Sequence, residues 1–152
     1  MNLTLPIAMR HPLDIILVED DDADAKAVRR ALGKAKIANP VTRLIDGVDA
    51  LAFLRGETGT PPASYILLVD LNMPRMNGLE LLTELRRDDQ LKGAVVFLLT
   101  TSGDRGDIAA AYERNVAGYI MKENAGDDFL NLIGTLDHYW RLVELPEIQP
   151  RG

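Results

Sequence analysis

Five short apolar segments, repeated along the chain, constrain the fold more than any other feature of this sequence. They are rich in Val, Ile and Leu and have the length of β-strands. The segments are DIILV (14–18), VTRLI (41–45), YILLV (65–69), AVVFLL (94–99) and GYIM (118–121). The second segment alternates between apolar and polar residues more than the others do, which predicts an edge strand with one face in water.

Helical patterns lie between and after these segments. Apolar residues recur at helical spacing within 22–34, 46–56, 78–88, 105–115 and 127–143. Asp22 is the expected N-cap of the first helix. The expected buried stripe of the second helix contains Val48, Leu51 and Leu54.

Strands that alternate with helices favour a parallel sheet covered by helices on both faces. With right-handed crossovers, the result is a three-layer α/β sandwich. We therefore predict a flavodoxin-like (βα)5 fold whose five parallel strands have the order 2-1-3-4-5. In this order the first and third strands are neighbours, and their carboxyl ends meet at one edge of the sheet.

Length and composition fit one globular domain. The chain has 152 residues, of which 47% are hydrophobic and 26% charged. The expected organisation is an N-terminal arm (1–12), a domain (13–145) and a short C-terminal tail (146–152) without an effector domain.

The charge and the residue types exclude several classes of function. The net charge of −6 argues against nucleic acid and anionic membranes as partners. The absence of cysteine excludes disulfides and thiolate metal sites and suits a cytoplasmic protein. No apolar run approaches the roughly 18 residues of a membrane span.

An acid ends the third apolar segment. Alone, Asp70 could be a turn residue or a helix cap. In the predicted strand order, however, Glu19 and Asp20 after the first strand converge on Asp70. Three close carboxylates need a cation, and oxygen ligands without His or Cys suit Mg²⁺. We assign Asp22 and Asp24 to the favourable start of a helix.

The fourth and fifth strands also end in polar residues. Thr100 brings a hydroxyl to the same edge, although a Thr-Thr-Ser sequence can be a routine turn. Lys122 follows a strand directly, and its ammonium needs a partner there. Acids, a hydroxyl and a cation together suit phosphoryl transfer, with Asp70 as the nucleophile.

The chain resembles the receiver domains of two-component response regulators. The motifs are ILVED (16–20), LLVDLNMPRMNG (67–78), LLTTS (98–102) and GYIMK (118–122), in the family's order and spacing. The segments ALAFLRGE (50–57) and HYWRLVELP (138–146) look most like stand-alone regulators that accompany bacterial phytochrome kinases.

The resemblance implies roles for the acids. The residue at Asp70 accepts a phosphoryl group from the phosphohistidine of a histidine kinase. The acid at Asp20 binds Mg²⁺ directly, the acid at Glu19 acts commonly through water, and the backbone carbonyl of Asn72 completes the ligands. Such a protein is no enzyme beyond catalysing its own aspartyl phosphorylation and dephosphorylation.

The resemblance also implies a switch. Thr100 would hydrogen-bond the attached phosphoryl group and Lys122 would pair with it. Tyr119 stands at the aromatic position that turns inward on activation, although it could equally be a plain strand residue. Output through a downstream protein is expected, since no effector domain is expected.

The sequence departs from the family pattern at two positions, and the resemblance also implies a dimer surface. Glu123 replaces the usual proline after the lysine, and Glu19 replaces the commoner Asp. A homodimer is expected through apolar residues near the end of the last helix, namely Tyr139, Trp140, Leu142 and Val143. A fold of these residues back onto the domain is the alternative.

Two other functions are compatible with parts of the pattern. A Mg²⁺-dependent phosphohydrolase with an aspartyl nucleophile would want a second Asp at position 72, where this chain has Asn72. A pseudo-receiver would bind partners without phosphorylation; the set of acids, Thr100 and Lys122 argues against this function, whereas Glu123 after the lysine leaves it open.

Overall fold

The structure is a computed structural model that describes residues 14–34, 40–101 and 103–122. The predicted helix 127–143, Glu123 and the four candidate dimer residues (Tyr139, Trp140, Leu142 and Val143) lie outside these ranges.

Strands and helices alternate strictly along the described chain. In order they are β1 (Asp14–Val18), α1 (Asp22–Lys34), β2 (Val41–Leu44), α2 (Gly47–Leu54), β3 (Tyr65–Asp70), α3 (Gly78–Arg87), β4 (Val95–Thr100), α4 (Arg105–Glu113) and β5 (Gly118–Met121). The strands form one parallel sheet in the order β2-β1-β3-β4-β5. The predicted fold class and strand order are confirmed. No helix of the described ranges is long and apolar enough to cross a membrane.

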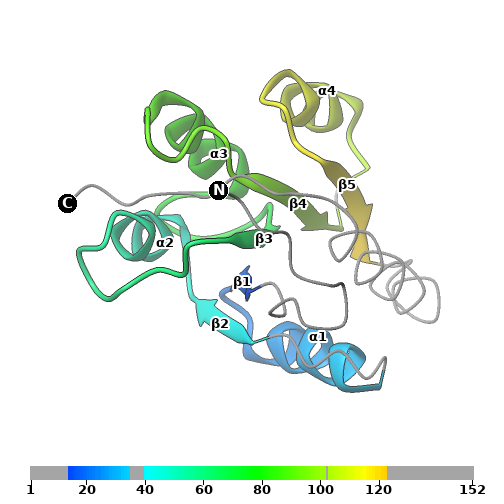
Figure 1. The fold of residues 1–152 in the computed structure, drawn as a ribbon. Coiled ribbons are helices and arrows are strands. Elements are labelled where there is room, and N and C mark those ends of the chain that lie inside the picture. Colours follow the sequence, from blue (N-terminus) through cyan, green and yellow to red (C-terminus); the bar gives the residue numbers. More distant parts are fainter. Residues whose placement is uncertain (1–13, 35–39, 102, 123–152) are drawn as a thin grey trace, which may run out of the picture.

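The helices cover the two faces of the sheet unequally in the described chain (Figure 1). Helices α2, α3 and α4 pack on one face, where Ile16, Leu67 and Leu98 belong to the larger apolar core. Helix α1 packs on the other face against alternate residues such as Leu17 and Leu68. This partition follows from the two-residue period of a strand.

The burial of the strands reflects their places in the sheet. All six residues of the central strand β3 are buried, as expected when helices cover both faces. The four residues of β2 are only partly buried, which confirms the predicted edge strand. This strand ends at Leu44, one residue earlier than predicted, and Ile45 is exposed.

Two local predictions were wrong. The Asp24 backbone N–H donates to the side chain of Asp21, so Asp21, not Asp22, caps α1. Val48 is exposed, because the buried stripe of α2 runs through Ala50, Leu51 and Leu54. Gly47 also belongs to this stripe. Val48 follows Gly47 directly, so its side chain lies about 100° away from that residue around the helix.

The connection from β3 to α3 is packed closely beside Asp70. Asn77 caps α3 in a reciprocal capping box with Glu80. At Gly78, a Cβ atom would lie 2.8 Å from the backbone oxygen of Asp70 and 2.9 Å from the Cα of Leu71. Glycine therefore allows the start of α3 to pack against the end of β3.

Candidate functional site

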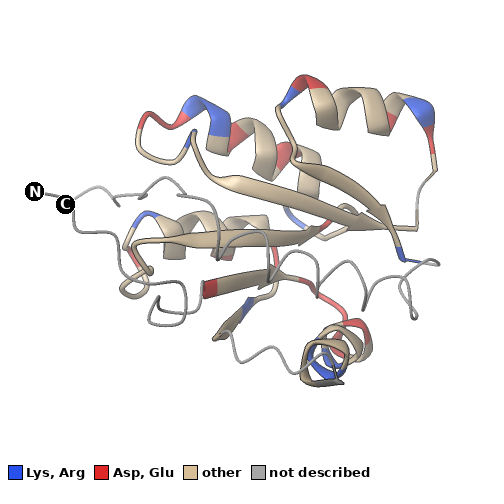
Figure 2. Cartoon of the chain, turned by 45° about the vertical axis from the view of Figure 1, so that its right-hand side comes forward, with Lys and Arg blue, Asp and Glu red and all other residues tan. Residues whose placement is uncertain are grey.

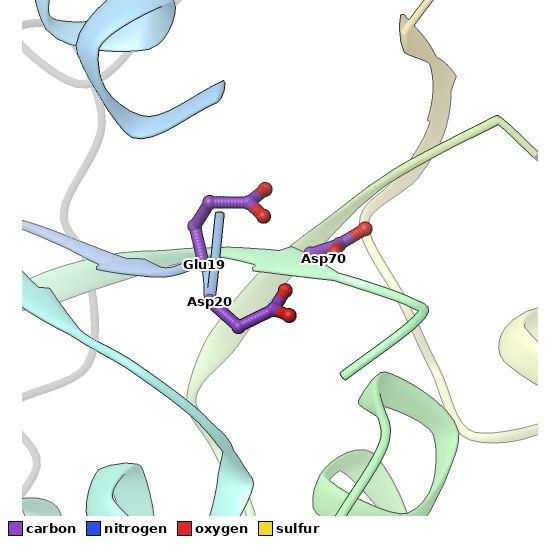
Figure 3. Close-up of side chains that lie close together, drawn as sticks. All are labelled: Glu19, Asp20 and Asp70. Atoms are coloured by element: carbon purple, nitrogen blue, oxygen red, sulfur yellow. The ribbon is translucent and has the colours of Figure 1, made fainter. Parts of the chain in front are cut away.

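The ends of β1 and β3 bring three acids together. Val18 pairs with Val69, so Glu19 follows β1 next to the position where Asp70 ends β3. One carboxylate oxygen each from Glu19, Asp20 and Asp70 lies within 4.8 Å of the others. Their carboxylates point toward a common space (Figure 3). Glu19 and Asp70 are buried, whereas Asp20 is exposed.

Lys122 lies among these acids. It follows β5, and its Nζ is 3.1 Å from Glu19 Oε2 and 3.3 Å from Asp70 Oδ1. Its side chain is four-fifths buried, so water screens the ion pairs less than at an open surface. The structure thus brings together the acids and the ammonium that the sequence predicts for this edge of the sheet.

A fourth acid, Asp24, also reaches Lys122. The Lys122 ammonium donates a hydrogen bond of 2.7 Å to Asp24 Oδ2, which is the shortest of its described contacts with carboxylates. Acidic residues gather between β1 and α1 and at the start of α1 (Figure 2). The sequence predicts only a helix-start role for Asp24, so sequence reasoning missed this contact.

The pKa values reflect burial of like charges. Burial, together with the charge of Asp70, raises the pKa of Glu19 to about 7, although the Asp21 N–H and Lys122 oppose the change. Burial also raises the pKa of Asp70, against the opposing effects of Lys122 and the Asn72 backbone N–H. For Lys122, burial acts to lower the pKa, but the surrounding carboxylates outweigh it and raise the pKa.

The residues fit a divalent cation. Glu19 Oε2 is buried and has no hydrogen-bond donor among the described residues; its contact with Lys122 is an ion pair. The Lys122 ammonium is shared among Glu19, Asp24 and Asp70, so a second cation would lower the cost of burying this charged oxygen. All the donors are oxygens, which suits Mg²⁺ and related hard cations. The Asn72 carbonyl remains a predicted ligand.

The two predicted switch residues belong to the neighbouring strands. Thr100 is the last residue of β4 and is fully buried, one position beyond the Asp70–Leu99 pair of the sheet. Tyr119 pairs with Leu98 and packs against the larger core, on the face covered by α2, α3 and α4. Their parts in switching remain predictions.

Sequence reasoning also missed an ion-pair network beside the site. Arg75 Nε lies 2.7 Å from Asp46 Oδ2, and Arg75 NH2 lies 3.0 Å from Asp49 Oδ1. Arg75 has a φ of 62°, a left-handed conformation that is uncommon for any residue other than glycine. The network joins the loop after Asp70 to the start of α2, where Asp46 is the N-cap.

Comparisons with known proteins agree with this geometry. Residues 15–134 match the response regulator receiver domain family. Response regulator Rcp1 of Synechocystis sp. is 36% identical over 138 residues, which cover 89% of this chain and 94% of Rcp1. The crystal structure of the Mn²⁺-bound form of Rcp1 has a TM-score of 0.74 at 34% identity and covers 89% of this chain and 99% of that one.

A second solved structure is similar to this chain. The crystal structure of the phosphorylated cyanobacterial phytochrome response regulator RcpA has a TM-score of 0.77 at 32% identity. It covers 90% of this chain and 100% of that one.

The family match extends over every strand end that carries a site residue. It includes Glu19, Asp20, Asp70, Thr100 and Lys122, and most of the chain around them. The chain belongs to the response regulator receiver domain family.

Proposed function

We propose that this chain is a response regulator that accepts a phosphoryl group on Asp70 from the phosphohistidine of a histidine kinase. The observation that carries the proposal is the convergence of Glu19, Asp20, Asp70 and Lys122 at one edge of the sheet. In the transfer, the P–N bond of the phosphohistidine breaks, a P–O bond to Asp70 forms, and the electron pair of the broken bond stays on the imidazole.

The proposed ligands are Glu19, Asp20, Asp70 and the Asn72 carbonyl. When bound there, Mg²⁺ would neutralise part of the charge on the carboxylates and on the phosphoryl group. The protein holds Asp70 rigidly at the end of a fully buried strand, which fixes the direction of the nucleophile. The ammonium of Lys122 lies close enough to pair with a phosphoryl oxygen on Asp70.

The proposed output is a shift between two conformations. A phosphoryl group adds about −1.5 to −2 charges and three acceptors beside Thr100 and Lys122. Reversal of an equilibrium from mostly off to mostly on needs about 5.5 kcal/mol, whereas one charge-assisted hydrogen bond contributes about 1.5–3 kcal/mol. Both residues are therefore required. Tyr119 on β5 is the proposed aromatic residue that turns inward on activation.

The proposed partners follow from the relatives. RcpA is described as a phytochrome response regulator and another similar structure as a regulator in red light signalling of R. palustris. We therefore infer a bacteriophytochrome kinase as the phosphoryl donor, in the cytoplasm, and a downstream protein as the target. A homodimer through the candidate residues 139–143 remains part of the proposal.

Phosphotransfer tests the proposal. Autophosphorylated kinases, bacteriophytochromes among them, are mixed with the chain and Mg²⁺, and transfer of radiolabel is followed. Labelling should require Mg²⁺ and should be lost in Asp70→Asn. Beryllofluoride, which mimics the phosphoryl group, gives a test that needs no kinase. If the wild-type protein neither becomes labelled nor binds beryllofluoride with Mg²⁺, the chain is a pseudo-receiver and the proposal fails.

A further inference from the structure

Lys122 makes its shortest described carboxylate contact with an acid outside the proposed metal ligands. The hydrogen bond to Asp24 is 2.7 Å long, whereas the ion pairs with Glu19 and Asp70 are 3.1 and 3.3 Å long. Charge-assisted hydrogen bonds of this length are the strong ones. In this state, the Lys122 ammonium therefore lies closer to the carboxylate of Asp24 than to those of Glu19 and Asp70.

Asp24 is held in place by its own helix. It lies in the first turn of α1, and its backbone N–H donates to the side chain of Asp21 at 2.9 Å. Its side chain is 47% exposed, while that of Lys122 is 20% exposed. Asp24 thus presents a carboxylate at the rim of the site, where it contacts the ammonium without being buried in the acid cluster.

We propose that Asp24 is a positioning residue that holds Lys122 back and so weakens the interaction of the ammonium with a phosphoryl group on Asp70. This inference rests on the function proposed above. An incoming phosphoryl group must compete with Asp24 for the ammonium and also meets the negative charge of Asp24. Both effects oppose phosphoryl binding, so Asp24 favours the unphosphorylated state.

Asp22 provides a matched control. It lies in the same helical turn, and it pairs with Arg43 at 2.7 Å with its side chain 84% exposed. Asp24→Asn and Asp22→Asn remove the same charge from the same helix N-terminus, so their effects on the helix dipole are alike. Only the first removes a carboxylate that contacts Lys122.

The affinity for beryllofluoride in Mg²⁺ is measured for the wild-type protein, both variants and Asp70→Asn. Asp24→Asn should bind about fivefold more tightly than Asp22→Asn, the effect of one half-exposed charge-assisted hydrogen bond. Asp24→Ala, compared with Asp22→Ala, also removes the acceptor and should tighten binding at least as much.

A second measurement uses the metal-free protein. The ¹H–¹⁵N signal of the Lys122 ammonium, assigned with Lys122→Arg, should move in Asp24→Asn and stay in place in Asp22→Asn. If the wild-type protein binds beryllofluoride but the Asp24 and Asp22 variants bind equally, or Asp24→Asn binds more weakly, the inference is overturned while the proposed function stands. A wild-type protein that does not bind beryllofluoride would overturn both.

Discussion

Replacement of Glu19 by Gln should make the metal-free protein more stable, and more so as the pH rises. Folding raises the pKa of Glu19 from its ordinary 4.5 to about 7, chiefly through burial. The folded state therefore binds this proton more tightly than the unfolded state does. A carboxyl group of this kind lowers the free energy of unfolding as the pH rises from 4.5 through 7. The neutral amide introduced by Glu19→Gln would carry no such penalty.

The size of the stability difference follows from the size of the pKa shift of Glu19. Each pKa unit corresponds to about 1.4 kcal/mol, so the ionised Glu19 costs the folded state roughly 3 kcal/mol once it is fully charged. Integration over pH predicts that Glu19→Gln gains about 1 kcal/mol at pH 5.5 and about 3 kcal/mol at pH 8.5. The higher pH lies far from the pI near 4.9, where solubility is lowest, and the lower pH lies above it.

Urea unfolding in a metal chelator measures this difference. Glu57→Gln is the control, because Glu57 is exposed and lies in the loop after α2. Mg²⁺ at pH 8.5 should then stabilise the wild-type protein more than Glu19→Gln, since a ligand that binds only the folded state raises its stability. An advantage of Glu19→Gln that is the same at both pH values would refute the reasoning.

Three further predictions concern the loop, the helix start and the core around the site. Arg75→Ala should lower the urea midpoint of unfolding, and Arg75→Gly should lower it less, because glycine tolerates the φ of 62°; equal midpoints would argue against backbone strain. Gly78→Ala should cost about 1–3 kcal/mol and weaken Mg²⁺ binding measured by calorimetry, because its Cβ would crowd the Asp70 backbone; an unchanged affinity would count against this coupling. Leu82→Ala, in the fully buried core, should cost about 2–5 kcal/mol in urea unfolding, and a loss below about 1 kcal/mol would contradict the packing described.

The sequence predicts the strands well because their burial is nearly complete. A central strand such as β3 must be apolar on both faces, so its residues alone identify it. Exposure at the edge of the sheet is harder to predict. Ile45 and Val48 are apolar and yet exposed, because the chain turns between β2 and a short helix that buries other residues of its sequence against the core.

One part of the candidate site could likewise be predicted from the sequence, and another part could not. Glu19, Asp70 and Lys122 could be predicted to meet, because parallel strands fix where their carboxyl ends lie. The contact of Asp24 with Lys122 could not be predicted, because it depends on how α1 packs on the sheet and not on where the strands end. The favourable charge at a helix start was a sufficient explanation for an acid there, so no local signal distinguished Asp24 from Asp22.

The instability of the acid cluster and its capacity to bind a cation have one physical cause. Burial keeps water from Glu19 and Asp70 and raises the pKa of each, so their ionised forms are poorly compensated in the metal-free protein. One ammonium, shared with Asp24, cannot neutralise all of these carboxylates. The same charge repulsion that lowers the stability of the metal-free protein therefore raises its affinity for a divalent cation. A substitution that relieves the charge repulsion should therefore stabilise the metal-free protein and weaken its Mg²⁺ binding together.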